Sequence, residues 1–83
     1  MAEHPNTFHL VIASVGETRF DGAAISATVP GGAGEVTVLP NHEPLVTTLK
    51  PGTITVKTTQ DTQEFSVESG VLECSGSRVV VLL

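Results

Sequence analysis

The 83-residue sequence is long enough for one compact domain with a single thin core. It carries nine acidic and four basic residues, so a phosphate backbone would meet the repulsive field of a chain with a formal net charge of −5. It also has no Trp or Tyr and only three Phe, and therefore lacks the aromatic side chains on which bases stack. These features argue against nucleic acid as a partner.

The composition favours β-structure. Val, Thr and Ile supply 26 of the 83 residues, and branching at Cβ suits a pleated strand better than a helix. Eight Gly and five Pro interrupt the chain at the rhythm of short strands and tight turns. The prediction is one all-β domain over residues 1–83, an antiparallel β-sandwich or flattened barrel of about ten short strands, with residues 1–6 flexible.

Strands in the first part of the chain follow from the alternation of apolar and polar residues. A strand is predicted at 7–13, with Phe8, Leu10 and Ile12 on one face. After a turn at Gly16 and a short strand at 18–20, Asp21-Gly22 has the composition of a turn. The next strand is predicted at 23–29.

The glycine-rich segment 30–34 ends that strand. It lacks the lysine and hydroxyl of a P-loop and no helical pattern follows it, so a phosphate-binding role is disfavoured. A strand at 35–39 leads into 40–44, where two prolines predict a stiff loop. A further extended segment is predicted at 45–49.

The remaining turns and strands are equally short. The strand at 53–58 is expected to form a hairpin with its partner at 63–68, and Gly70 is expected to mark a bulge or bend. The apolar run 78–83 is predicted to be a strand buried on both faces. The other elements are a turn at 50–52 and a strand at 71–74.

The residue types that carry chemistry are sparse and scattered. His4, His9 and His42 show none of the spacings that define a metal site. His42 and Glu43 are adjacent, and neighbouring side chains of extended structure point to opposite faces. Cys74 cannot form an internal disulfide and is predicted to be a buried apolar side chain in a reducing compartment. We therefore predict no catalysis, no cofactor and no metal.

A longer motif lies at residues 34–52, which read Gly-Glu-Val-Thr-Val-Leu-Pro-Asn-His-Glu-Pro-Leu-Val-Thr-Thr-Leu-Lys-Pro-Gly. This segment closely resembles the signature of the N-terminal domain of the ATP synthase ε subunit: GE, four residues, PxHxPL, a short strand and PG. Phe20-Asp21-Gly22 resembles an early turn of that family, and 69–73 and 79–82 resemble its closing strands. The resemblance spans roughly residues 7 to 83.

The resemblance implies a ten-stranded β-sandwich and a non-catalytic subunit of the central stalk of a proton-translocating F-type ATP synthase. Such a subunit binds the γ subunit and rests on the ring of c subunits, coupling rotation to ATP synthesis. Its expected location is peripheral, at the cytoplasmic face of the bacterial inner membrane. No stretch approaches the ~20 apolar residues that span a bilayer, so contact with the membrane is expected only through the c-ring.

The resemblance also implies a set of contact residues. Glu35 matches the glutamate of the family that contacts the c-ring, and His42 matches a loop histidine near that contact; Asn41 and Glu43 complete the predicted set. A carboxylate at Glu35 would form a charge-assisted hydrogen bond with a basic residue of the ring. The residues expected to shape this region are Gly34, Pro40, Pro44, Pro51 and Gly52.

Three departures from the family pattern bear on function. Glu43 stands where a small residue is common, which adds negative charge at the predicted ring contact, and Ser69 replaces the first of two glycines. Most members continue into two inhibitory C-terminal helices, whereas this sequence stops at Leu83, so inhibition through that hairpin is not expected if the ending is natural; the sequence does not decide whether it is.

One alternative stays open: a free-standing β-sandwich that binds small molecules or other proteins, which would require a concave pocket with convergent polar groups. The face that would meet γ cannot be identified from the sequence. Exposed apolar side chains are expected on one face, because partner surfaces carry larger apolar patches than other surfaces.

Overall fold

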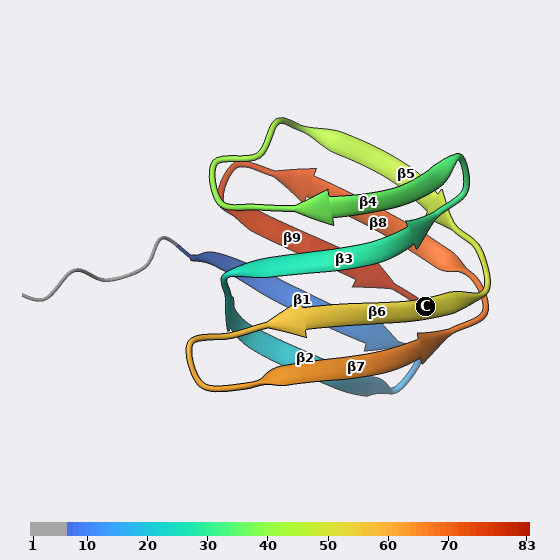
Figure 1. Ribbon diagram of the computed structural model, residues 1–83. Coiled ribbons are helices and arrows are strands. Elements are labelled where there is room, and N and C mark those ends of the chain that lie inside the picture. The colour runs from blue at the N-terminus through green and yellow to red at the C-terminus, as the bar shows by residue number, and fades with distance from the viewer. Residues whose placement is uncertain (1–6) are drawn as a thin grey trace, which may run out of the picture.

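The computed structural model describes residues 7–83, and the predicted flexible segment 1–6 lies outside this range. Residues 7–83 contain no helix and are built from short strands (Figure 1). The nine strands are β1 (Phe8–Ser14), β2 (Glu17–Ala24), β3 (Ser26–Gly31), β4 (Gly34–Val38), β5 (Leu45–Leu49), β6 (Gly52–Lys57), β7 (Thr62–Val67), β8 (Gly70–Ser75) and β9 (Arg78–Leu82).

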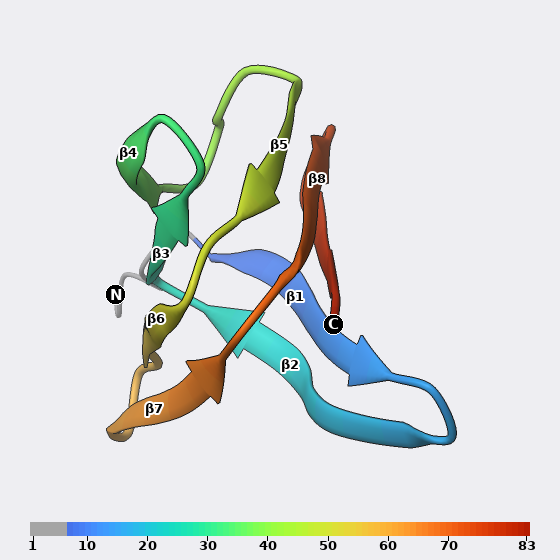
Figure 2. The ribbon, with the colours of Figure 1, turned by 90° about the vertical axis from the view of Figure 1, so that its right-hand side faces the viewer.

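The strands form one sheet that curls into two layers (Figures 1 and 2). One layer has the order β2-β1-β9-β8-β5, and the other has the order β4-β3-β6-β7. The pair Gly31↔Leu49 joins them. The predicted all-β sandwich is confirmed. It departs from the expected antiparallel pattern at β1 and β9, which run parallel.

Two of the connections that pass from one layer to the other belong to one bent hairpin. β5 continues into β6 through Lys50 and Pro51, and β7 continues into β8 through a bend at residues 68–69 (Figure 2). Because β5 pairs with β8 and β6 pairs with β7, these four strands make one long hairpin that is bent across the sandwich. The bend that was predicted near Gly70 lies at residues 68–69, directly before this glycine.

Gly70 is required by close packing. A Cβ atom at this position would lie 2.5 Å from the carbonyl oxygen of Leu82, which is backbone and cannot move aside. Glycine thus lets β8 approach the end of β9 directly after the bend.

The core lies between the layers and follows the predicted alternation. Phe8, Leu10 and Ile12 of β1 are buried, as predicted, and so are Ile54 and Val56 of β6. Cys74 is buried as well, and burial raises the pKa of its thiol above the usual 9.0. The other buried apolar residues are Ala24, Ala27, Val29, Val38, Leu49, Val67, Leu72, Val79 and Val81.

Two predictions in the first half of the chain were wrong. Asp21-Gly22 is not a turn but lies inside β2, opposite Val11 and Leu10 of β1. The ladder between β1 and β2 outweighs the local turn preference of this dipeptide. The strand predicted at 23–29 is also divided, because the chain bends at Ile25 and passes from β2 into β3 of the other layer.

The prediction that residues 78–83 are buried on both faces was also wrong. β9 buries Val79 and Val81 in the core, but Leu82 is 56% exposed and Val80 is only half-buried. The two residues that point away from the core are therefore apolar and face the surface.

Candidate docking surfaces

The loop between β4 and β5 has little backbone freedom. A turn at Pro40 and Asn41 opens it and Pro44 closes it. Asn41 has a φ of 64°, in the left-handed region, which Asn tolerates better than most residues. His42 and Glu43 follow on this rigid segment, so their positions are set with little conformational entropy to lose on docking.

His42 does not project freely into solvent. Its ring packs edge to face against Phe8 at the start of β1, with the ring centroids 5.9 Å apart and the planes at 90°. Its Nδ1 lies 3.4 Å from the carbonyl oxygen of Glu43, and its Nε2 is buried with no hydrogen-bond partner within residues 7–83. The imidazole is therefore turned toward the domain.

Glu35 lies near the other end of β4. Its side chain is exposed and points away from the core, because Val36 and Val38 take the inward positions of this strand. At ~3.3 Å per residue, Glu35 is ~10 Å along the strand from Val38, which precedes the loop. The structure therefore brings the predicted contact residues to one edge of the sandwich, but not into one cluster.

The glycine-rich turn beside Glu35 packs closely against the end of β5. The N–H of Gly32 donates to the carbonyl of Thr48, 2.8 Å away, and the N–H of Lys50 donates to the carbonyl of Pro30, 2.9 Å away. A Cβ atom on Gly32 would lie 2.8 Å from Oγ1 of Thr48. Glycine thus lets the β3–β4 turn dock on the end of β5.

Charged side chains in this region are not neutralised within the domain. Within residues 7–83 the only ion pair joins Nε2 of His9 to Oδ1 of Asp21, 2.6 Å apart, and it lies on β1 and β2. Glu35 and Glu43 have no ion-pair partner in that range and are exposed. Their carboxylates are accessible to a cationic partner.

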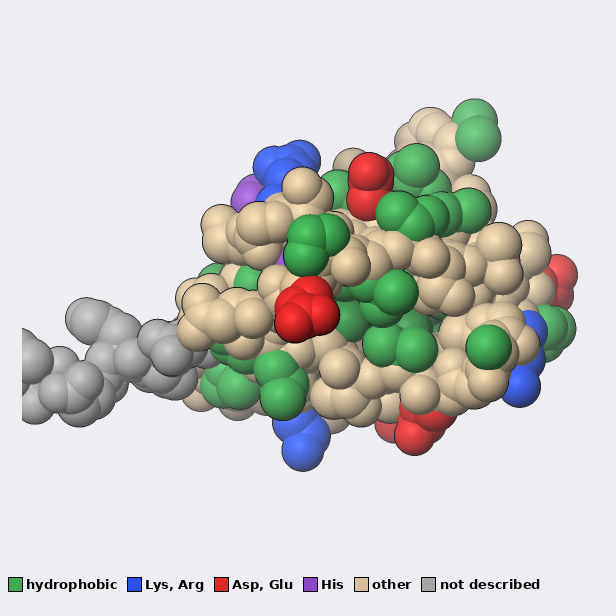
Figure 3. Space-filling model, turned by 90° about the horizontal axis from the view of Figure 1, so that it is seen from above, with side chains coloured by type: hydrophobic (Ala, Val, Ile, Leu, Met, Phe, Trp, Pro, Cys, Tyr) green, Lys and Arg blue, Asp and Glu red, His purple; other side chains and the backbone are tan. Residues whose placement is uncertain are grey.

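The edge formed by β4 and β5 also carries apolar groups. Leu39, Leu45 and Val46 are all exposed there. Figure 3 looks down on this side of the sandwich and shows patches of hydrophobic side chains with acidic side chains between them. Such a mixed surface suits a partner that offers both apolar and basic groups.

The two outer faces of the sandwich differ in character. On the layer of β4, β3, β6 and β7, the outward positions are mostly hydroxyl or charged: Glu35, Thr37, Ser26, Thr28, Thr53, Thr55, Lys57, Thr62, Glu64 and Ser66. On the other layer, the paired outward positions include six apolar side chains beside polar ones such as Glu73, which lies between Val46 and Val80. We call the apolar members the apolar outer face: Val11, Ala13, Val46, Val71, Val80 and Leu82.

The apolar outer face was not located from the sequence. Its positions come from four strands, and the registers Val11↔Val80, Ala13↔Leu82 and Val71↔Leu82 bring five of them side by side, whereas Val46 lies opposite Glu73. Val46 is 68% exposed and Leu82 is 56% exposed, so a large apolar area is open to solvent. The feature of the sequence that indicates this face is the unbroken apolar run of β9. Its outward side chains are also apolar, which is typical of a surface that another protein covers.

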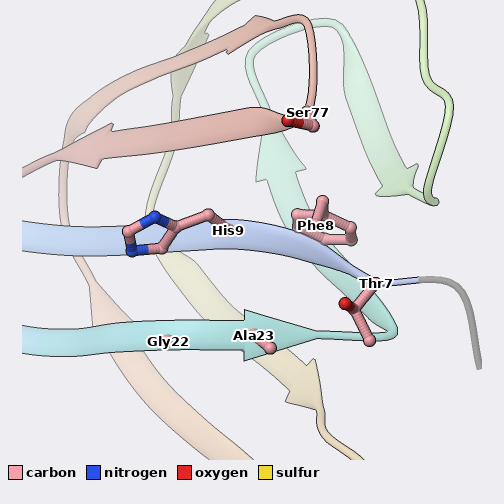
Figure 4. Close-up of a pocket in the computed structure, with 6 residues that line it drawn as sticks. All are labelled: Thr7, Phe8, His9, Gly22, Ala23 and Ser77. Carbon is pink, nitrogen blue, oxygen red and sulfur yellow. The ribbon is translucent and has the colours of Figure 1, made fainter. Parts of the chain in front are cut away.

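Surface hollows are further candidates for a binding site, and two of them lie within residues 7–83. One, of about 380 Å³, is formed by β1, β2 and the turn before β9, and is lined by Thr7, Phe8, His9, Gly22, Ala23 and Ser77 (Figure 4). Its one titratable side chain, His9, is bound to Asp21. The other, of about 430 Å³, is lined by Ser14, Arg19, Ser66, Val67, Glu68, Ser69 and Leu83.

Across residues 7–83 no three His, Cys, Asp or Glu side chains are grouped so that they could hold a metal ion. The same range has no helix with the length and apolarity that crossing a membrane requires.

Sequence comparisons match this chain to one family. The family described as ATP synthase, Delta/Epsilon chain, beta-sandwich domain, matches residues 7–83. The ATP synthase epsilon chain of Polaromonas naphthalenivorans is 38% identical over 78 residues, and that of Delftia acidovorans is 37% identical over 78 residues. In both cases the match covers 93% of this chain and 56% of the relative. The chain therefore spans little more than half the length of these relatives.

Structural comparisons identify the same fold in larger assemblies. A chain of the Euglena gracilis mitochondrial ATP synthase, from a structure of OSCP, F1 and c-ring, superposes with a TM-score of 0.86 at 20% identity, covering 98% of this chain and 52% of that one. A chain from the central stalk and c-ring of the Tetrahymena thermophila mitochondrial enzyme superposes with a TM-score of 0.75 at 12% identity, covering 89% and 60%.

Proposed function

Because the chain belongs to the family of β-sandwich domains of ATP synthase delta and epsilon chains, we propose that it is a non-catalytic rotor subunit of an F-type ATP synthase. In this role it docks the γ subunit onto the c-ring and couples rotation to ATP synthesis. The observation that carries the proposal is an exposed apolar surface on the outer side of β5, β8 and β9, which adjoins an edge that bears the exposed carboxylates of Glu35 and Glu43.

The γ subunit is the proposed occupant of the apolar outer face. Val46, Val71 and Leu82 would lose their remaining contact with water on docking, and burial of apolar area is the main favourable term of such association. The opposite face carries threonine and serine hydroxyls that water already satisfies. Docking of γ on the apolar outer face therefore leaves the polar face in solvent.

The c-ring is the proposed occupant of the edge that carries Glu35 and the loop of Asn41, His42 and Glu43. Glu35 and Glu43 would pair with basic groups of the ring, and such exposed pairs determine orientation more than affinity. Through these contacts the subunit would be held at the cytoplasmic face of a bacterial inner membrane, with the ring providing its attachment to the bilayer.

The alternative is a free-standing module that binds small molecules or other proteins. It would use one of the two hollows, but a ligand site normally combines an enclosed apolar cavity with convergent polar groups. The hollow beside His9 is open and lined in part by Gly22 and Ala23, and the imidazole there is already bound to Asp21. The exposed surfaces support docking of proteins better than they support small-molecule binding.

The experiment that tests the proposal compares Glu35→Gln with a matched control, Glu64→Gln, in the assembled enzyme. Both residues are exposed on strands of the same layer, but Glu64 lies on β7, away from the β4–β5 edge. We expect Glu35→Gln to weaken ring attachment and ATP-driven proton pumping, with Glu64→Gln unchanged. Pumping and attachment that are normal in both variants would refute the assigned ring contact, and failure of the wild-type chain to co-purify with γ would refute the function.

A further inference from the structure

The contact between His42 and Phe8 joins two parts of the chain with different roles. Phe8 begins β1 and is buried in the core, whereas His42 lies on the loop that follows β4. Their rings meet edge to face with centroids 5.9 Å apart, a geometry that stabilises aromatic pairs. The contact therefore fastens the loop to the layer whose outer surface is the apolar outer face.

The nitrogen atoms of His42 are poorly placed to bind another protein. The carbonyl oxygen of Glu43 can only accept a hydrogen bond, so the 3.4 Å contact assigns the proton of a neutral imidazole to Nδ1. Nε2 then carries a lone pair that is buried without a donor among residues 7–83. Nδ1 therefore faces the backbone of the loop, and Nε2 is inaccessible to solvent.

We propose that His42 is a positioning residue: its imidazole anchors the loop on Phe8, and it thereby holds Asn41 and Glu43 in the orientation that meets the c-ring. What His42 contributes is the shape of its ring and not a hydrogen bond to the partner. The inference rests on the proposed function for the identity of the partner, but the anchor itself is a property of this chain alone.

The design of the test separates the ring from its nitrogens. His42→Phe keeps an aromatic ring against Phe8 and removes both nitrogens, whereas His42→Ala removes the ring. Phe8→Leu keeps an apolar side chain in the core, so the domain still folds while the aromatic partner is lost. The double variant His42→Ala/Phe8→Leu reports whether the two residues act as a pair.

The first measurement is the backbone order parameter of Asn41, His42 and Glu43 from NMR relaxation of the 83-residue chain. An aromatic pair contributes enough for loss of the ring to raise the population of the detached loop about five-fold in His42→Ala, which lowers these order parameters. We expect the same decrease in Phe8→Leu, no further decrease in the double variant, and wild-type order parameters in His42→Phe. Amides of the Thr59–Asp61 loop serve as the control and should not change.

Two results would overturn the inference. If the order parameters of His42→Phe fell as far as those of His42→Ala, the nitrogens and not the ring would hold the loop. If the effects of His42→Ala and Phe8→Leu simply added in the double variant, the two rings would not act together.

The second measurement is proton pumping per ATP hydrolysed in the assembled enzyme. We expect His42→Ala to lower the ratio and His42→Phe to retain it. If Glu35→Gln lowers the ratio but His42→Ala does not, the anchor has no positioning role and the inference is wrong. If neither variant lowers the ratio, the ring contact of the proposed function fails and the claim that the anchor orients that contact fails with it, while the relaxation data still decide whether the anchor exists.

Discussion

Truncation of the apolar outer face should weaken binding of γ without weakening the fold. Val46→Ala removes two carbons and Leu82→Ala removes three, each worth about 0.8 kcal/mol when fully buried. Because Val46 is 68% exposed and Leu82 is 56% exposed, docking can bury only those shares, about 1.1 kcal/mol for Val46, about 1.3 kcal/mol for Leu82 and roughly 2.4 kcal/mol together. The two residues lie on β5 and β9, separated by β8, so their effects should add.

This sum predicts a Kd for purified γ about 50-fold above that of the unchanged chain, measured by isothermal titration calorimetry. The free energy of unfolding should change by less than about 1 kcal/mol, because both side chains are already largely in solvent. Thr53→Ala/Thr62→Ala, on the polar face, is the matched control and should bind γ normally. Equal affinity of the two double variants would refute the assignment of γ to the apolar outer face.

Three further outcomes are expected. Glu43→Ala removes a negative charge and should reduce the salt sensitivity of c-ring assembly, measured as the difference in attachment to the ring at low and at high ionic strength. The same salt dependence in the variant and the unchanged chain would refute a role for this charge. Gly70→Ala should lower the free energy of unfolding by about 1–3 kcal/mol in urea, because its Cβ would lie 2.5 Å from the Leu82 carbonyl oxygen, whereas Gly22→Ala, with ordinary contacts at 3.9 Å, should cost little. Burial raises the pKa of the Cys74 thiol, so the folded state holds this proton more tightly than the unfolded state does. The resulting contribution to the free energy of unfolding is complete below about pH 9.0 and is lost as the pH rises further. Stability curves of the unchanged chain and Cys74→Ala should therefore converge at high pH, and parallel curves would contradict the shift.

The parts of the fold that depend on local pattern could be predicted from the sequence. The inward positions of β1 and β6 follow from simple alternation, and the loop at 40–44 follows from its two prolines. Asp21-Gly22 was misread because its turn preference is local, whereas its place in β2 depends on the ladder with β1. Pairing between strands cannot be predicted from a short segment of sequence.

The site was predictable to the same extent. Glu35 and the 40–44 loop could be selected from a contiguous motif, but the contact of His42 with Phe8 joins residues far apart in the chain. The apolar outer face could not be located from the sequence. An apolar run such as 79–82 looks the same whether its second face is covered by the same domain or by another subunit. Only the registers with β1 and β8 distinguish the two cases.

The bent hairpin has a mechanical consequence for the proposed docking of two partners on different sides of the domain. Its two connections, at residues 50–51 and 68–69, carry continuous backbone from one layer to the other, so a force that slides the layers must also strain covalent chain and ladder hydrogen bonds. A sandwich joined only by apolar packing would resist sliding less, because it has only side-chain contacts between its layers. Twist applied at one outer surface is therefore delivered to the opposite edge with little lost to internal slippage.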